Sequence, residues 1–250
     1  SAVFRPRFTL QETMDTDDIL SHLARIAKRG SGGVVLKARD LPGIRDAVGH
    51  LFEKNIPTVT LVTDLPGSKR LSYIGINNRQ AGRTAAYLLA HAIRRPGPVF
   101  TTRSQDNFFG ETERFTAFRR ELNRLRPETD VVDIAGGAGL PGKTRPLFDA
   151  ALVNHPTPAA IYSMGGGNAA ILAALPGDMQ STTPFVAHDL DAENRALLAQ
   201  GALTFVLHHD LRADMTTALR TLAAHHGLHP EPPSNGLSML QVITPHTVGR

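Results

Sequence analysis

Polar side chains stand at the ends of the short apolar runs that predict strands in this sequence. A lysine, an aspartate and an asparagine follow three early strands, and an asparagine, an aspartate and a histidine follow three later ones. In open α/β sheets, ligands bind at the carboxyl ends of the strands. We therefore take six strand-end residues as candidates for binding a small ligand: Lys37, Asp64, Asn77, Asn168, Asp189 and His209.

Three of these residues also have a purely structural interpretation. Asp64 stands beside the Pro66-Gly67 dipeptide and would then shape a turn. Asn77 and Asn168 stand where helices are expected to begin, so each would serve as a helix cap. Both interpretations stay open at this point.

The eleven histidines lack the spacing of a metal site. His208 and His209 are adjacent on a predicted strand, so their side chains face opposite ways. His225, His226 and His229 end a helix, where histidine is favourable beside the terminal carbonyl groups. Because the chain has no H-E-x-x-H motif and no cysteine, we expect no metal.

The glycine triplet Gly165–Gly167 precedes a predicted helix, and such turns can place an anion at a helix N-terminus. The triplet is not a G-x-G-x-x-G motif, and no Walker lysine follows it. No G-x-S-x-G elbow stands between a strand and a helix either. An enzyme on a Rossmann-like scaffold is therefore the weaker alternative, and we expect neither a cofactor nor catalysis.

The elements that must position the candidates alternate along the chain. Apolar spacing predicts strands at 3–10, 34–36, 58–62, 71–76, 99–102, 131–135, 159–164, 185–187, 203–207 and 238–244. It predicts helices at 15–28, 41–52, 78–93, 110–125, 141–153, 168–175, 192–200 and 210–226, and a linker at 230–233. This alternation predicts an α/β fold with parallel sheets flanked by helices.

Composition places the chain among ordinary globular proteins. Its 250 residues are 41% hydrophobic and 20% charged, and no apolar run approaches the roughly 20 residues of a membrane span. The formal charge of +4 does not establish nucleic-acid binding by these residues. The absence of cysteine excludes disulfides and fits a cytoplasmic protein.

The stretch Ile56–Leu89 carries a family resemblance. A β-branched strand follows Ile56-Pro57, a second strand follows a Pro-Gly turn, and the motif Ile76–Gly82 opens an alanine-rich helix. This arrangement resembles the effector-binding core of LacI/GalR-type repressors, which is similar to periplasmic sugar-binding proteins. The resemblance covers nearly all of the chain. It implies two Rossmann-like lobes of the periplasmic-binding-protein type I, with a ligand cleft between the lobes.

The resemblance adds two candidates and assigns roles to others. Arg114, which alone would be read as a surface arginine, matches a helix-start arginine that faces the cleft in the family. Asp189 matches the aspartate that ends a V-G-(F/Y)-D strand, and His209 stands where relatives often carry a glutamine. Phe109 and its neighbour Phe108 would be aromatic walls for a sugar ring. The implied chemistry is recognition of vicinal hydroxyls by bidentate hydrogen bonds.

The family pattern also implies a domain organisation. The first lobe would span residues 1–96, with the helix 210–228 returning to it, and the second would span 97–209, with the final strand 237–250. The turn at Arg95–Pro98 is the expected crossing. The family's first strand and helix, and the DNA-reading helix-turn-helix ahead of them, are not visible here. We therefore interpret the sequence as a fragment of a longer regulator whose DNA-binding headpiece is absent.

These observations predict the ligand-sensing core of a LacI-type transcriptional regulator. A sugar or sugar derivative would act as effector, and a homodimer would pass the signal to operator DNA through the absent headpiece. The alternative is a periplasmic sugar-binding protein that feeds an ABC transporter. No membrane partner is expected for the regulator.

Overall fold

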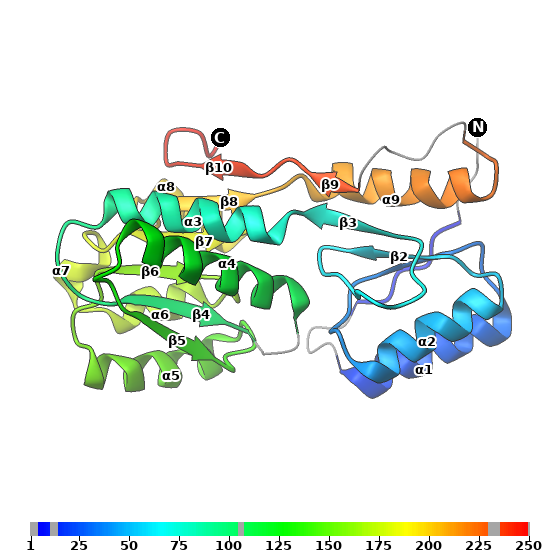
Figure 1. Ribbon diagram of the computed structural model, residues 1–250, viewed down its shortest axis with the longest axis horizontal. Helices are drawn as coiled ribbons and strands as arrows, with labels where there is room; N and C mark the ends of the chain where they lie inside the picture. The colour runs from blue at the N-terminus through cyan, green and yellow to red at the C-terminus, as the bar shows by residue number, and fades with distance from the viewer. Residues whose placement is uncertain (1–4, 11–14, 105–107, 230–235, 250) are drawn as a thin grey trace. The chain divides into compact units, whose positions relative to one another are not determined.

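The computed structural model describes residues 5–10, 15–104, 108–229 and 236–249, which form an α/β protein (Figure 1). The strands are β1 Val34–Leu36, β2 Thr58–Leu61, β3 Ser72–Ile76, β4 Val99–Arg103, β5 Val131–Ala135, β6 Ala160–Ser163, β7 Phe185–His188, β8 Phe205–His208, β9 Leu237–Ser238 and β10 Gln241–Ile243. The helices are α1 Thr16–Arg29, α2 Pro42–Glu53, α3 Asn78–Ala92, α4 Phe109–Leu125, α5 Pro141–Asn154, α6 Asn168–Ala174, α7 Gly177–Gln180, α8 Ala192–Ala199 and α9 Leu211–His225. The predicted α/β fold class is confirmed.

The chain divides into two compact units, and the first is built on a sheet of four parallel strands in the order β1-β2-β3-β9. Figure 1 shows α9 on one side of this sheet and α1 and α2 on the other. Alternation along the strands supplies both faces. Val34 and Leu36 join the core beneath α1 and α2, whereas Val59 and Ile74 pack against α9.

The second unit contains a sheet of six strands in the order β10-β8-β7-β6-β4-β5. All neighbours pair in parallel except β10, which is antiparallel to β8. On one face, Phe148 of α5 packs edge-on against Phe100 of β4, with ring centroids 5.4 Å apart. On the other face, Phe118 of α4 packs against Tyr162 of β6. Helices therefore cover both faces, as near-continuous apolar strands require.

Helix α3 belongs to the second unit, because the N-terminal segment of the first unit ends at Ile76 and the second unit begins at Asn77. This differs from the crossing expected near Pro96, which would leave the helix in the first lobe. Small residues explain the placement, since they let α3 approach α4 closely. A Cβ added to Gly82 would lie only 2.2 Å from the carbonyl oxygen of Arg114.

This close approach gives the first testable prediction. Replacing Gly82 with alanine should lower the free energy of unfolding by about 1–3 kcal/mol, because the added methyl group meets backbone rather than a movable side chain. This is the net loss, expected although removal of a helical glycine by itself would raise the free energy of unfolding by about 1 kcal/mol. Urea unfolding measures the change.

The matched control is Gly49→Ala within α2, where an added Cβ meets nothing within 4 Å. This variant should gain about 0.5–1 kcal/mol, the opposite sign. If both variants are stabilised alike, the close packing of α3 on α4 is wrong.

Two predicted strands differ from the structure at the chain ends. Residues 5–10 of the predicted strand 3–10 form no strand, and Phe8 and Leu10 are 82% and 95% exposed. Alternation alone cannot hold a strand that has no paired neighbour. Residues 3–4 lie outside the described residues, as does the predicted linker 230–233.

The predicted strand 238–244 is divided into two short strands. Ser238 of β9 pairs with Ile76 in the first unit, whereas Gln241 of β10 pairs with His208 in the second. The chain leaves the first unit after Met239. One apolar run therefore serves two sheets, a division that spacing along the sequence cannot reveal. Helix α9 groups with the first unit, where it packs on β2 and β3.

Candidate ligand-binding site

The strand order of the second unit creates a natural binding position. From β4 the chain proceeds outward to β5 and then returns to form β6 on the other side of β4. At such a switch point the connections leave in opposite directions, which opens a crevice at the carboxyl ends of the strands. Ser104 follows β4, and Asn168 follows β6 after the glycine triplet. Both side chains are buried.

Arg114 lies in the interior of the second unit rather than on the surface. It projects from α4, is only 6% exposed, and its Nε donates a 2.7 Å hydrogen bond to Oδ1 of Asn78. Asn78, the first residue of α3, is itself buried. Burying a guanidinium is unfavourable unless it is hydrogen-bonded, so this placement marks Arg114 as a residue with a specific role.

Glu111 lies one turn before Arg114 and accepts hydrogen bonds from Ser104. The Ser104 backbone N–H donates to Oε2 at 2.8 Å, and its hydroxyl donates to Oε1. Burial raises the pKa of Glu111, and the hydrogen bonds from Ser104 oppose this shift. The carboxyl group thereby ties the end of β4 to the first turn of α4, which carries Arg114.

His188, the last residue of β7, is buried beside another buried polar side chain. Its Nε2 lies 2.7 Å from the hydroxyl of Tyr162 on β6. Burial holds the pKa of His188 well below its ordinary value, and the charges of Arg114 and His209 act in the same direction. Burial likewise raises the pKa of Tyr162. Both side chains are therefore neutral at pH 7.

The neutral state of His188 predicts a pH effect on stability. Below about pH 6.5 a histidine in the unfolded chain binds a proton that the folded His188 does not. Unfolding then takes up a proton, so the free energy of unfolding falls by about 1.4 kcal/mol per pH unit from this group as pH decreases. His188→Gln should remove this contribution, so its stability should vary less steeply than wild type between pH 6.5 and 5.

The measurement is urea unfolding at several pH values, with the exposed His91→Gln as control. Glu111 acts with the opposite sign, because its raised pKa stabilises the fold below the unfolded pKa and is lost as pH rises. That contribution is common to the chains being compared and cancels in the difference. Equal slopes for wild type and His188→Gln would contradict the buried neutral state.

Asp189 follows His188 in a strained backbone conformation. Its φ of +65° is in the left-handed region, which aspartate tolerates better than most residues. Its N–H donates to the carbonyl of Leu207, and its carboxylate stays 47% exposed with Oδ1 3.6 Å from Nε2 of His209. Strain of this kind persists where surrounding contacts impose it, and it is frequent at ligand sites.

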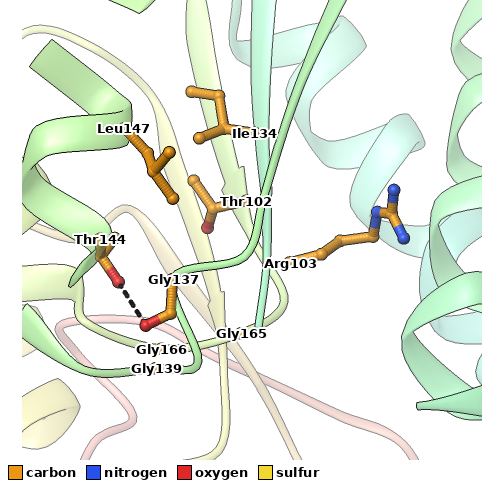
Figure 2. A pocket seen from close by; sticks show the side chains of 9 residues that line it. All are labelled: Thr102, Arg103, Ile134, Gly137, Gly139, Thr144, Leu147, Gly165 and Gly166. Carbon is orange, nitrogen blue, oxygen red and sulfur yellow. Dashed lines mark hydrogen bonds between the residues drawn. The ribbon is translucent and has the colours of Figure 1, made fainter. Parts of the chain in front are cut away.

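A small pocket lies at the same end of the sheet, on the face covered by α5 (Figure 2). Thr144 Oγ1 donates to the carbonyl of Gly137 across one side of it, while Arg103 extends away from it. None of the eight predicted site residues lines this pocket. Its lining consists of Thr102, Arg103, Ile134, Gly137, Gly139, Thr144, Leu147, Gly165 and Gly166.

Four predicted residues therefore come together in the second unit. Arg114 and His209 both act electrostatically on His188, His209 lies beside Asp189, and Asn168 is linked by hydrogen bonds through Asn194 to the backbone of His188 and Asp189. Asn168 does not cap α6, because the cap position is taken by Gly167. The capping interpretation of Asn168 is therefore wrong, and a ligand contact by Asn168 stays a prediction.

Asp64 is engaged within the first unit. Arg70 forms a bidentate ion pair with the carboxylate of Asp64. Oγ1 of Thr60 and the N–H of Leu65 also donate to Oδ1 of Asp64. These partners favour the turn-shaping interpretation, because a ligand would have to displace Arg70.

The remaining candidates stand in simpler surroundings. Asn77 is exposed and caps α3 by accepting from the Gln80 N–H at 3.0 Å, so its capping role is confirmed. Lys37 is exposed after β1, and Phe109 begins α4 half-buried. A ligand contact by any of these three stays a prediction.

Sequence reasoning missed Asn78, His188 and Asn194. Asn78 directly follows the candidate Asn77, and its side chain accepts a hydrogen bond from Arg114. The strand-end rule could have found His188, which directly precedes Asp189. Asn194 gave no signal, because it lies inside a helix and acts through contacts 26 residues apart in the chain.

Two features are absent from the described residues. Within 5–10, 15–104, 108–229 and 236–249, no three histidine, aspartate or glutamate side chains are arranged to hold a metal ion. No helix in those same ranges is long and apolar enough to cross a membrane.

Comparison with protein families identifies the family of this chain. The family described as the periplasmic binding protein domain matches residues 15–227. The chain belongs to this family. A search of curated proteins returned no match.

Solved structures of the same fold include both transport and regulatory proteins. GanP, a glucose-galactose binding protein from Geobacillus stearothermophilus, has a TM-score of 0.85 at 18% identity, over 94% of this chain and 84% of that one. A solute-binding protein of an ABC transporter from Burkholderia graminis, in complex with D-arabinose, has a TM-score of 0.85 at 20% identity, over 94% and 83%. A putative LacI transcriptional regulator from Bacteroides fragilis has a TM-score of 0.82 at 16% identity, over 94% and 83%. At these identities the likeness concerns the fold.

Proposed function

We propose that this chain binds a sugar or sugar derivative and serves as the effector-sensing core of a LacI-type transcriptional regulator. The observation that carries the proposal is the presence of a buried guanidinium, Arg114, and a half-exposed carboxylate, Asp189, in the second unit. The charge of Arg114 acts on His188, the residue that directly precedes Asp189. Solved relatives in complex with D-arabinose, or named for glucose and galactose binding, support this ligand class.

The roles of the side chains follow from their chemistry. The guanidinium of Arg114 donates hydrogen bonds to a ring or hydroxyl oxygen, and the carboxylate of Asp189 accepts from one or two adjacent hydroxyls. His209 lies beside Asp189 and orients its carboxylate. Such charge-assisted bonds are roughly twice as strong as neutral ones, and vicinal hydroxyls match their spacing.

Binding would act on the regulator without any bond being made or broken. An effector that binds one of two conformations more tightly shifts the population toward that conformation. In a cytoplasmic homodimer this shift would alter the affinity of attached headpieces for operator DNA. No catalytic step enters this mechanism.

The second candidate is a periplasmic sugar-binding protein of an ABC transporter. Transporter proteins among the similar structures favour it, and the same site would serve it. The coding sequence ahead of Ser1 separates the two candidates. A helix-turn-helix there supports the regulator, and a signal peptide supports the transporter.

The test of sugar binding is a thermal-shift screen with D-arabinose, D-glucose, D-galactose, D-fructose, sugar acids, polyols, purines and nicotinamide cofactors. A ligand at a hundred times its Kd stabilises the fold by about 2.7 kcal/mol. For a chain of this size that shift corresponds to roughly 5–10 °C. A shift with a sugar or polyol supports the proposal, whereas a shift with a nicotinamide cofactor alone overturns it.

A further inference from the structure

Asn194 connects the side chain of Asn168, which follows β6, with the backbone at the end of β7. It lies in the first turn of α8 and is only 2% exposed. Its Nδ2 donates to the carbonyl of His188 at 2.9 Å and to the carbonyl of Asp189 at 2.7 Å. Its Oδ1 accepts from Nδ2 of Asn168 at 2.7 Å.

Hydrogen-bond chemistry fixes how both amides are oriented. Backbone carbonyls only accept, so the nitrogen of Asn194 must face His188 and Asp189. Its oxygen must then face Asn168, which has to present its nitrogen in return. A flip of either amide would place acceptor against acceptor or donor against donor.

The consequence is that Oδ1 of Asn168 is fixed as an acceptor, because Nδ2 of the same amide faces Asn194. Oδ1 of Asn168 is buried and has no hydrogen-bond donor among the described residues. Asn168 itself is 1% exposed and follows Gly167, at the end of the sheet where the strand order switches. A buried acceptor without a donor is unfavourable, and a donor supplied by a ligand relieves it.

We infer that Asn194 is a positioning residue that fixes the orientation of the Asn168 amide, so that Asn168 presents its Oδ1 as a hydrogen-bond acceptor to the ligand. The site then selects a ligand with a hydroxyl or amino donor at that position over a ligand with only an acceptor there. The inference rests on the proposed function for its ligand and on the amide network for its geometry. It specifies the ligand more closely than sugar binding alone, because a carbonyl, carboxylate or fluorine at that position is disfavoured.

The same side chain also supports Asp189. The bond from Nδ2 to the Asp189 carbonyl holds a residue whose φ is +65°, and the backbone N–H of Asn194 donates to Asp191 at the start of α8. One residue thereby couples the orientation of Asn168 to the conformation of Asp189. Its removal should affect both, but only the orientation of Asn168 changes the choice between donor and acceptor.

The first experiment needs no ligand. Hydrogen exchange of side-chain amide protons, followed by NMR on ¹⁵N-labelled protein, should show the Nδ2 protons of Asn168 protected in wild type. In Asn194→Ala this exchange should accelerate by about tenfold or more, because the acceptor is gone. Unchanged exchange of Asn168 would overturn the network, whatever ligand the protein binds.

The second experiment measures selectivity by isothermal titration with D-galactose and D-glucose and their monoamino and monodeoxyfluoro derivatives. An ammonium group only donates, whereas a C–F group only accepts. At one ring position the ratio of Kd for the fluoro and amino derivatives should be large in wild type, and it should fall at least about tenfold in Asn194→Ala. A merely structural role would weaken both derivatives equally and leave the ratio unchanged, which would overturn the inference.

Further variants keep the test decisive. If Asn194→Ala does not fold, Asn194→Ser replaces it in the test. The serine side chain is too short to bridge both partners, so this variant should show the same loss of selectivity. Asn168→Ala should also lose the selectivity, and adding Asn194→Ala to it should change the ratio no further. The exposed Asn123→Ala should retain the wild-type ratio. Failure of every sugar to bind wild type would overturn the proposed function, while the exchange experiment would still decide the network.

Discussion

Replacing Arg114 with alanine should raise the Kd for the bound sugar by about 10²- to 10³-fold. Hydrogen bonds to a charged donor contribute about 1.5–3 kcal/mol each, and a planar guanidinium can donate two to one ligand. The variant should also lose some stability, because the buried hydrogen bond from Nε of Arg114 to Oδ1 of Asn78 is removed. Isothermal titration gives the affinity and urea unfolding gives the stability.

Two further variants separate charge from geometry. Arg114→Lys keeps the positive charge but loses the planar fork and the Nε donor, so its affinity should fall between those of wild type and Arg114→Ala. Arg120→Ala removes an exposed arginine from the same helix and should bind like wild type. If Arg114→Ala and Arg120→Ala bind equally well, Arg114 is not part of the site.

The second large effect is expected at Asp189. Asp189→Asn preserves the shape and tolerates the positive φ, but it replaces a charged acceptor by a neutral amide. The Kd should rise by about 10- to 100-fold with little change in stability. Asp189→Ala should lose at least as much affinity and, in addition, about 1–2 kcal/mol of stability, because alanine is unfavourable in the left-handed region.

The control for this pair is Asp178→Asn, which neutralises an exposed aspartate in the second unit. It tests whether a general change of charge alters binding. Wild-type affinity in Asp189→Asn would show that the carboxylate contacts no ligand, and the position of the site would have to be reconsidered.

Local spacing predicted most of the fold because most of its determinants are local. The cap at Asn77 is followed by a run of small residues, and the structure confirms both the cap and the helix α3. Residue spacing gave wrong strand predictions where the pairing of strands determines the structure. The run near the C-terminus serves two sheets, and residues 5–10 alternate without joining a strand.

The candidate site was predictable only in part, for the same physical reason. Asp189 and His209 follow their strands directly, so the strand-end rule identifies them. The hydrogen bond from Arg114 to Asn78 joins side chains 36 residues apart, and it depends on how closely α4 approaches α3. Asp64 also follows a strand, but it is paired with Arg70. The strand-end rule could not predict this pair, because it depends on the path of a single loop.

The most direct test of sugar binding at this site is a crystal structure of the chain with the sugar that stabilises it most. We expect ligand hydroxyls within hydrogen-bond distance of the Arg114 guanidinium and the Asp189 carboxylate, and a ligand donor on Oδ1 of Asn168. A sugar bound elsewhere, with Arg114 still donating to Asn78 and not to the sugar, would contradict the proposed site.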